Sequence, residues 1–267
     1  MAKEVGAGKS RQKIELEMLK IRQEHKDYGC LRMTGELRNR GCLANKKKVQ
    51  RLLKKLDIRV TSFTRRTRKY NSYKGTVGRV AKNRIRRRFD TNMVHQKITT
   101  DTTEFKCFEP DDKGSVVIRK LYLNPFMDMF NGEIISYHIS EQPTNTAIML
   151  ALEKAIEVTK DCCYRRTFHS DQGWAYQHEK YVRKLRDNKI FQSMSRKGNC
   201  LDNAVMENFF GILKQEMYYG EVYRSYTKLQ QAIEDYIVYY NNNRMKKKLN
   251  WMSPVQYREK HQKIGVA

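Results

Sequence analysis

The stretch of sequence that decides the fold begins at residues 169–177, HSDQGWAYQ, and resumes at residues 193–216 with SMSRKGNCLDNAVMENFFGILKQE. It places Asp171 at the end of a predicted strand and Glu207 inside a predicted helix, with 35 residues between them. A third acid, Asp101, lies upstream in ITTDTTEF, a Thr-rich run typical of a strand. Side chains that project from a rigid sheet can be held in a fixed arrangement. The three acids are therefore candidate metal ligands.

Two Mg²⁺ ions are the cofactor that this set of acids favours, and Mn²⁺ is expected to be able to replace them. Mg²⁺ takes oxygen ligands and usually keeps waters and substrate phosphates in its coordination shell. Two ions about 3.5–4 Å apart can stabilise both the attacking and the leaving oxygen of a phosphodiester. A single acid chosen blindly is more often a solvated surface residue than a ligand. Three acids on three compatible elements strengthen the hypothesis.

The positive charge of the chain is concentrated in its first third. The 267 residues include 54 Lys and Arg and 29 Asp and Glu, which gives a formal net charge of +25. Residues 1–98 hold 29 basic and 8 acidic residues, and residues 58–89 hold twelve basic residues and no acidic one. This asymmetry predicts a polyanionic partner, DNA, bound chiefly through the N-terminal third. The alternative is a soluble protein with a basic surface.

Several classes of protein are disfavoured by simple sequence features. The six cysteines form no C-x-x-C pair and have no histidine at zinc-finger spacing, so we expect reduced thiols in a cytoplasmic protein. The longest apolar run, residues 147–152, is too short to cross a bilayer, and no apolar secretory signal stands at the N-terminus. Residues 8–10, GKS, resemble the end of a P-loop, but Lys3 stands where that motif needs glycine. A disordered start is predicted instead.

Four segments are expected along the chain. Residues 1–57 are predicted to form a helical, helix-turn-helix-like DNA-binding domain. Residues 58–96 are predicted to be a basic linker that follows DNA phosphates. Residues 97–220 are expected to form the catalytic core, and residues 221–267 a C-terminal helical extension of that core.

The N-terminal domain is predicted to contain three helices, the last of which has a basic face. Asn45 is predicted to cap its start. The residues that recur at helical spacing on its apolar face are Val49, Leu52, Leu53 and Leu56. The candidate DNA contacts on its other face are Lys47, Lys48, Arg51, Lys54 and Lys55. A small helical bundle with a solvated charged face fits the pattern equally well.

The core is predicted to be an α/β domain with a mixed sheet. The expected strands are residues 97–108, 115–130, 133–140, 165–169 and 190–194. The expected helices are residues 144–159, 177–187, 202–218 and 225–241. Three antiparallel strands followed by alternating helices and strands have the order of a ribonuclease-H-like fold.

One face of the predicted 202–218 helix carries residues suited to the site. Asn203, Glu207, Gly211 and Lys214 recur on that face, so Lys214 could reach a phosphate from beside the glutamate. Asp202, which precedes the helix, is interpreted as its N-cap.

Other residues near the acids have competing interpretations. Arg196 and Lys197 lie in a basic loop, for which DNA contact is slightly favoured over plain solvation. His169 is interpreted as a hydrogen-bonded scaffold residue. Trp174 and Tyr176 could stack on an unpaired base, but packing is the preferred interpretation.

Several stretches together resemble the transposases of bacterial insertion sequences. They are HSDQGWAYQ, QSMSRKGNCLDNAVMENFFGILKQE, YYNNNR and MSPVQYR. The similarity extends over residues 14–258 through three further stretches, which are ITTDTTEF, LYLNPFMDMFNGEIISY and YGCLRMTGELRNRGCLANKKKVQRLLKKL. The chain resembles the second-frame product of the IS-three family, whose enzyme is encoded in two overlapping frames. Relatives often carry a Lys-Gly pair where this chain has Asn250-Trp251.

The resemblance implies a retroviral-integrase-type core whose catalytic triad falls on Asp101, Asp171 and Glu207, with the family's basic residue at Lys214. It implies a DDE-type transposase that cleaves element ends with Mg²⁺ and joins the freed 3′-hydroxyl to another strand. The implied partners are terminal-repeat and target DNA, further copies of the chain on that DNA, and a first-frame product to which such enzymes are generally fused. The expected location is the bacterial cytoplasm, at the nucleoid, with no membrane partner.

Two other functions remain open at this stage. A non-catalytic DNA-binding regulator would bind element DNA through residues 11–90 and use the core for dimerisation. A ribonuclease H acting on RNA–DNA hybrids would explain the core but not the basic N-terminal third. The presence of all three acids favours the transposase over the regulator.

Overall fold

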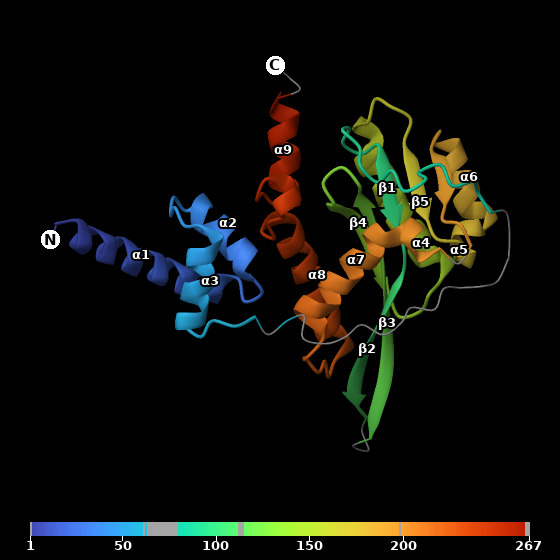
Figure 1. Ribbon diagram of the computed structural model, residues 1–267. Helices are drawn as coiled ribbons and strands as arrows, with labels where there is room; N and C mark the ends of the chain where they lie inside the picture. The colour runs from blue at the N-terminus through green and yellow to red at the C-terminus, as the bar shows by residue number, and fades with distance from the viewer. Residues whose placement is uncertain (1, 61, 63–79, 112–114, 198, 265–267) are drawn as a thin grey trace. The chain divides into compact units, whose positions relative to one another are not determined.

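The computed structural model describes residues 2–60, 62, 80–111, 115–197 and 199–264 (Figure 1). The chain divides into two compact units. The N-terminal unit consists of residues 1–66 together with residues 244–253, and the core unit consists of residues 67–243 and 254–267. Each unit is described separately.

Three helices build the N-terminal unit, as the sequence predicts. They are α1 (Ala2–Glu24), α2 (Cys30–Asn39) and α3 (Lys46–Lys55). The side chain of Asn45 accepts the backbone N–H of Lys48 at 2.8 Å, which confirms the predicted cap of α3. Residues 8–10 lie within α1, so the predicted disordered start is wrong.

A short segment from far along the chain completes this unit. Residues 244–253 contribute Met245 to the apolar cluster of the three helices, and the ring of Trp251 packs on Gly35 of α2. A Cβ atom at Gly35 would lie only 2.5 Å from Cε3 of Trp251. Asn250 and Trp251 have φ angles of 53° and 63°, a backbone conformation that glycine adopts more readily. This segment therefore belongs with the N-terminal unit and not with the C-terminal extension expected from the sequence.

A six-stranded mixed sheet forms the centre of the core unit. Its strands are β1 (Lys97–Thr100), β2 (Thr103–Pro110), β3 (Val116–Asp128), β4 (Ile134–Ser140), β5 (Thr167–Ser170) and β6 (Phe191–Met194). The order is β2-β3-β1-β5-β6, and β4 pairs with β3. The first four strands pair antiparallel, whereas β1 with β5 and β5 with β6 pair parallel. The predicted ribonuclease-H-like, integrase-type sheet is confirmed.

The predicted strand 97–108 is two strands, because the chain leaves the ladder at Asp101 and Thr102. The Asp101 carboxylate accepts a hydrogen bond from the backbone N–H of Thr102 at 2.8 Å. In a continuous strand this N–H would instead donate to a neighbouring strand of the sheet.

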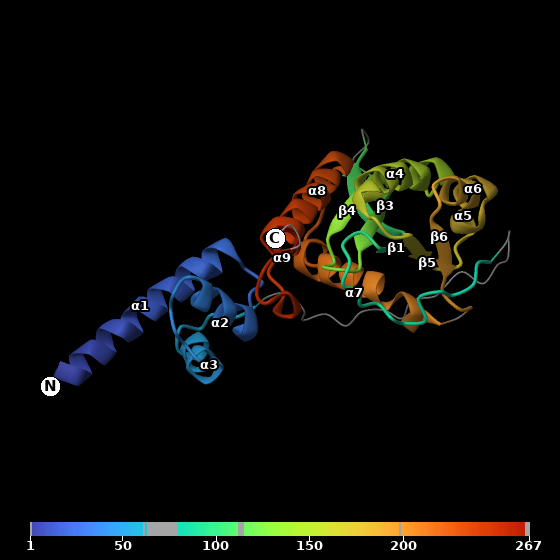
Figure 2. The same cartoon turned by 90° about the horizontal axis from the view of Figure 1, so that it is seen from above.

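Helices cover both faces of the sheet. They are α4 (Asn145–Val158), α5 (Trp174–Gln177), α6 (Glu179–Asp187), α7 (Ala204–Leu213), α8 (Tyr226–Asn242) and α9 (Pro254–Ile264), and α7 continues into a π-helical turn, Lys214–Tyr218. Figure 2 shows α4 and α6 on one side of the sheet and α7 on the other. Because successive side chains of a strand face opposite ways, Phe126 joins the apolar cluster of α4 and α6, and Met127 joins that of α7 and α8.

Two further features of the core unit differ from a simple sandwich. Residues 80–96, expected in the basic linker, pack on the core: Ile85 is buried, and the backbone N–H of Arg84 donates to Ser193 Oγ at 2.9 Å. The remaining linker residues 63–79 lie outside the described residues.

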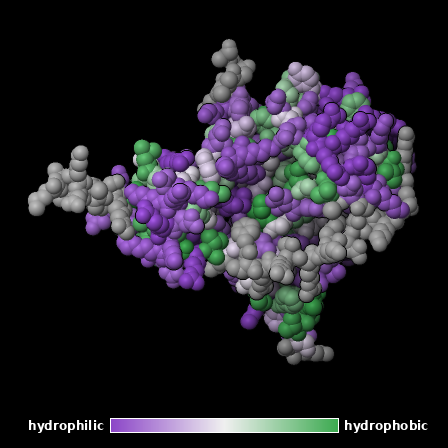
Figure 3. Space-filling model, in the orientation of Figure 1, coloured by the Kyte–Doolittle hydropathy of each residue, from purple (hydrophilic) through white to green (hydrophobic). Residues whose placement is uncertain are grey.

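The hairpin of β2 and β3 extends beyond β4, and exposed Val116 and Ile118 contribute to the apolar patch at the bottom of Figure 3. Within the described residues, no helix has the length and apolarity needed to cross a bilayer.

The contact between Gly35 and Trp251 yields a test of the N-terminal unit. Gly35→Ala should lower its free energy of unfolding by about 1–3 kcal/mol, because the added methyl overpacks the indole ring. Urea unfolding followed by tryptophan fluorescence measures the change. Gly29→Ala is the matched control, since a Cβ atom there would meet only Val60 at 3.9 Å. Equal effects of the two substitutions would show that the indole does not require a glycine.

Candidate active site

Two aspartates leave the sheet side by side. Strands β1 and β5 run parallel, and Thr99 of β1 pairs with His169 of β5. Asp101 lies two residues after Thr99, and Asp171 lies two residues after His169. Both carboxylates are therefore at the same end of adjacent strands. Asp101 is 7% exposed. The sheet therefore brings together two acids that are 70 positions apart in the sequence.

Burial makes the ionised form of these two acids unfavourable. Burial and the neighbouring charges of Asp171 and Glu207 raise the pKa of Asp101 well above its usual range. Burial likewise raises the pKa of Asp171, although its carboxylate accepts the backbone N–H of Gly173 at 2.8 Å. Buried like charges that are not offset destabilise a fold, and a bound cation is one way to offset them.

Glu207 reaches the site from α7. Burial raises its pKa, and its charge acts on Asp101, so all three predicted acids lie within electrostatic range. Among the described residues, no group of three or more His, Cys, Asp or Glu side chains is already arranged to hold a metal ion. The donors are all carboxylate oxygens, and together with the repulsion at Asp101 they fit a hard divalent cation such as Mg²⁺.

Asn203 connects the helix of Glu207 to the aspartates. Its amide nitrogen donates to Asp101 Oδ2 at 3.0 Å, and its oxygen lies 3.2 Å from the Thr99 hydroxyl, which donates to it. The sequence showed that Asn203 shares a helical face with Glu207, but it did not indicate this contact. Asn203 thus holds Asp101 in position from the turn that precedes α7.

The segment after Asp171 is packed so closely that position 173 has no room for a side chain. A Cβ atom at Gly173 would lie 2.9 Å from Asp171 Oδ1 and 3.2 Å from the ring of Tyr176. Tyr176 is buried, and its hydroxyl is 3.4 Å from that of Thr102. Burial and the charges of the two aspartates raise the pKa of Tyr176 well above its usual value, so it stays a neutral hydroxyl. The preferred packing interpretation of Tyr176 is confirmed.

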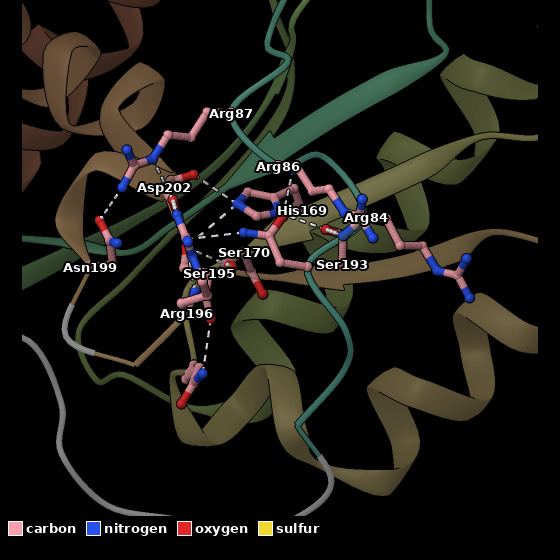
Figure 4. Close-up of polar contacts among 12 residues, drawn as sticks. Arg84, Arg86, Arg87, His169, Ser170, Ser193, Ser195, Arg196, Asn199 and Asp202 are labelled. Carbon is pink, nitrogen blue, oxygen red and sulfur yellow. Dashed lines mark hydrogen bonds and ion pairs between the residues drawn. The ribbon is translucent and has the colours of Figure 1, made fainter.

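Asp202 is a buried anchor for two arginines (Figure 4). Its carboxylate accepts Nε of Arg87 at 2.8 Å and two nitrogens of Arg196, each at 2.9 Å. Asn83 donates to the same group at 3.0 Å. The hydrogen bonds from Arg196 hold the pKa of Asp202 well below its usual range. The predicted N-cap role is wrong, because Asn203 occupies the position before α7 and no side chain caps that helix.

His169 links the same turn to β5. Its Nε2 lies 2.9 Å from the backbone carbonyl of Asp202, which can only accept, so Nε2 carries the proton. Its Nδ1 accepts the hydroxyl of Ser193 at 2.9 Å. Burial lowers the pKa of the imidazole, so it is neutral. The scaffold interpretation of His169 is confirmed, and it fixes the strand two residues before Asp171.

The predicted DNA contacts near the site have different surroundings. Arg196 pairs with Asp202, although its side chain is 60% exposed, and Lys197 is exposed. Lys214 lies where α7 becomes π-helical, with Nζ 5.1 Å from the centre of the Phe105 ring. Burial lowers the pKa of Lys214, and the charges of Glu104 and Asp101 oppose that shift.

The predicted DNA contacts of the N-terminal unit lie on α3. Lys47, Arg51 and Lys54 line a surface hollow of about 630 Å³ together with Asn45 and Gln50. Lys48 is half-buried, and Lys55 forms an ion pair with Glu15 at 2.9 Å. Contact of these residues with DNA stays a prediction.

Family models match most of the chain. An HTH-like domain matches residues 9–69, and two models described as integrase core domain match residues 91–200 and 207–261. An uncharacterized transposase-like protein of Haemophilus influenzae is 44% identical over 80% of this chain and 93% of its own length. The putative transposase InsK for insertion sequence element IS150 of Escherichia coli is 41% identical over 86% of this chain and 77% of its own length.

Among solved structures, the chain is similar to the HTLV-2 integrase catalytic core domain in complex with magnesium. The match spans 62% of this chain and 97% of the integrase chain. Its sequence identity is 16% and its TM-score 0.45.

The anchor at Asp202 predicts a pH-dependent stability. Asp202→Asn should lower the free energy of unfolding at pH 7 by about 1–3 kcal/mol, because charge-assisted hydrogen bonds from Arg87 and Arg196 are removed. The folded-state pKa of Asp202 lies below its unfolded value. Its contribution is therefore complete above roughly pH 4 and is lost as the pH falls through the folded-state pKa.

Urea unfolding from pH 8 down to pH 2 measures this difference between the two proteins. Asp187→Asn is the control, since Asp187 pairs with Arg186 at 3.7 Å on an exposed surface and should contribute little. A difference at Asp202 that persists unchanged at the lowest pH would contradict the ionic anchor.

Proposed function

The chain belongs to the integrase-core transposases of bacterial insertion sequences, in the IS-three family, and we propose that it cleaves DNA at the ends of such an element and joins the freed 3′-hydroxyl to a second strand. The catalytic acids are Asp101, Asp171 and Glu207. The observation that carries this proposal is the parallel pairing of β1 and β5, which sets buried Asp101 beside half-buried Asp171, within range of the glutamate.

Asp101, Asp171 and Glu207 would hold two Mg²⁺ ions, or Mn²⁺ in their place. Bound there, the ions would supply positive charge that stabilises the oxygens around the reacting phosphorus. The all-oxygen donor set and the raised pKa of Asp101 support this assignment, since both are expected where carboxylates converge on a cation.

The surrounding residues position the acids before DNA arrives. Asn203 orients Asp101 through a hydrogen bond, and the backbone N–H of Gly173 orients Asp171. Because these contacts are made within the folded protein, the acids need little rearrangement on binding. Water attacks the phosphorus in line, and the bond from phosphorus to the 3′-oxygen breaks, which leaves a 5′-phosphate and frees a 3′-hydroxyl. That hydroxyl then attacks a phosphorus of a second strand and displaces the 3′-oxygen there, with no covalent enzyme intermediate.

DNA is held by basic residues outside the triad. Lys214 meets the phosphate next to the scissile bond as a point charge, and Arg196 and Lys197 contact DNA beside the site. Residues 1–57 bind the terminal repeats through the basic face of α3, formed by Lys47, Lys48, Arg51, Lys54 and Lys55. Residues 58–79 follow the phosphates, while residues 97–220 and the extension that stays with the core, residues 221–243 and 254–267, carry out catalysis.

The assembly follows from the two DNA substrates. Copies of the chain bring together two element ends and the target DNA, and a first-frame product is fused to the chain or bound by it. The protein works at the nucleoid in the bacterial cytoplasm.

The catalytic assignment is tested one acid at a time. Asp101→Asn, Asp171→Asn and Glu207→Gln should each reduce cleavage of element-end DNA to background while DNA affinity stays near the wild-type value, because these residues hold metal ions and contact no phosphate directly. Cleavage and gel-shift assays on the full chain, and on its fusion with the first-frame product, measure both properties. Asp235→Asn is the control, because Asp235 is exposed on α8. Wild-type cleavage by any one variant removes that residue from the triad.

The role of Lys214 is tested with two substitutions. Lys214→Met should reduce cleavage by about a hundredfold, because a half-buried cation beside the reacting phosphate is removed, while Lys214→Arg should retain part of the activity. Mn²⁺ binding to the acids, followed by calorimetry, should persist in both variants. Lys228→Met removes an exposed charge on α8 and serves as the control. Wild-type cleavage by Lys214→Met would show that this ammonium does not meet the DNA.

A further inference from the structure

Residues 80–88, which we name the strap, have an inner and an outer row of side chains. On the inner row, Asn83 donates to Asp202 at 3.0 Å and Ile85 is buried. On the outer row, Lys82, Arg84 and Arg86 are exposed. The alternation of exposed and covered side chains holds over residues 81–86 and ends in a turn, where Arg86 and Arg87 have φ angles of 49° and 62°. Basic side chains therefore stand in a regular row on a segment whose backbone is tied down.

The strap forms one wall of a basic hollow of about 410 Å³. Its cationic lining residues are Lys82, Arg84, Arg165 and Arg186, and none of the described residues that line it is acidic. Buried Leu185 and Ile190 form its apolar floor. Arg186 pairs with Asp187 at 3.7 Å on the exposed surface, whereas no ion pair with a described acid offsets Arg84 or Arg165, so the hollow combines a positive rim with an apolar base.

Two guanidinium groups of the rim are held by one aromatic ring. The guanidinium carbon of Arg84 lies 4.2 Å from the centre of the Phe191 ring, and that of Arg165 lies 3.7 Å from it. The cation–π contact holds each guanidinium group against the ring, and N–H donors of a guanidinium that does not form an ion pair can bind an anion. Within the described part of the chain, neither arginine forms an ion pair with a carboxylate, and no acidic residue lines the hollow, so both positive charges are available to an anion.

The hollow is separate from the candidate active site. Phe191 begins β6 and pairs with Thr167 at the start of β5, whereas Asp171 follows the other end of β5. Figure 4 shows the Arg84 side chain extending away from His169 and Asp202, while Arg87 turns toward Asp202. The strap therefore uses Arg87 as an internal anchor and presents Arg84 to the hollow.

We propose that this hollow is a second DNA-binding site, which holds the sugar–phosphate backbone of a duplex away from the scissile phosphate. Guanidinium groups bind phosphate through paired, charge-assisted hydrogen bonds, and the apolar floor suits the deoxyribose carbons between phosphates. The proposal rests on the proposed function in taking DNA as the substrate. The bound segment is either element DNA inside the cleaved end or target DNA, which present the same backbone chemistry.

The test removes the two stacked cations. Arg84→Ala/Arg165→Ala, placed in the full chain with Asp101→Asn, should weaken duplex binding and flatten the dependence of log K on log salt by about 0.9 for each phosphate that is no longer neutralised. Fluorescence anisotropy over a salt series measures both changes on an element-end duplex and on an unrelated duplex. The Asp101→Asn background makes the measurement independent of cleavage, so a failure of the catalytic assignment leaves this result intact.

Two comparison proteins make the outcome decisive. Lys154→Ala/Lys160→Ala removes two exposed charges on the α4 side and should leave the salt dependence unchanged. Arg84→Lys/Arg165→Lys keeps both charges and should retain the salt dependence but bind less tightly, because lysine forms neither the paired hydrogen bonds nor the stacking of a guanidinium. Weakening confined to the element-end duplex assigns the hollow to element DNA, and equal weakening on both duplexes assigns it to any duplex backbone.

An unchanged affinity and salt dependence in the alanine variant would overturn the proposal. So would equal losses of affinity in the α4 control, because the effect would then follow net charge. Far-ultraviolet circular dichroism checks that each variant is folded. If the alanine variant is unfolded, the lysine variant decides, and wild-type affinity in that protein would also overturn the proposal.

Discussion

The rest of the core unit depends on the parallel pairing of β1 with β5. Its register sets Thr99 against His169 and so carries Asp101 and Asp171 out of the sheet together. Burial then makes their charges unfavourable, and the pKa of Asp101 rises in response. A fold optimised only for stability would avoid a buried and a half-buried carboxylate side by side at this edge. Their presence supports the proposal that the site receives cations.

Much of the surrounding polar structure holds that edge in place. His169 fixes β5 by hydrogen bonds to Ser193 and to the carbonyl of Asp202. Asn203, the next residue, reaches across to Asp101. The two strands that carry the aspartates and the turn that leads to Glu207 are thus connected through two consecutive residues. Asp202 can serve this role because two arginines satisfy its buried carboxylate.

The positive charge of the N-terminal third serves more than one purpose. In the strap, Arg87 is directed inward to an acid, whereas Arg84 stacks on an aromatic ring and remains exposed. On α3, Lys55 is paired with Glu15, while Arg51 lines an open hollow. Net charge predicts a polyanion partner. It does not distinguish the arginines that stabilise the fold from those free to bind DNA.

The sequence by itself predicted the order of the core, most of its helices and strands and the three candidate acids, since periodicity, turn residues and motifs are properties of neighbouring residues. It also predicted the Asn45 cap, which is a local contact. Only the tertiary structure decided that Asp202 anchors arginines, that Asn203 holds Asp101, and that Trp251 packs on Gly35. Each of these contacts joins residues far apart in the chain. Their partners are selected by sheet register and packing, which no local pattern of residues encodes.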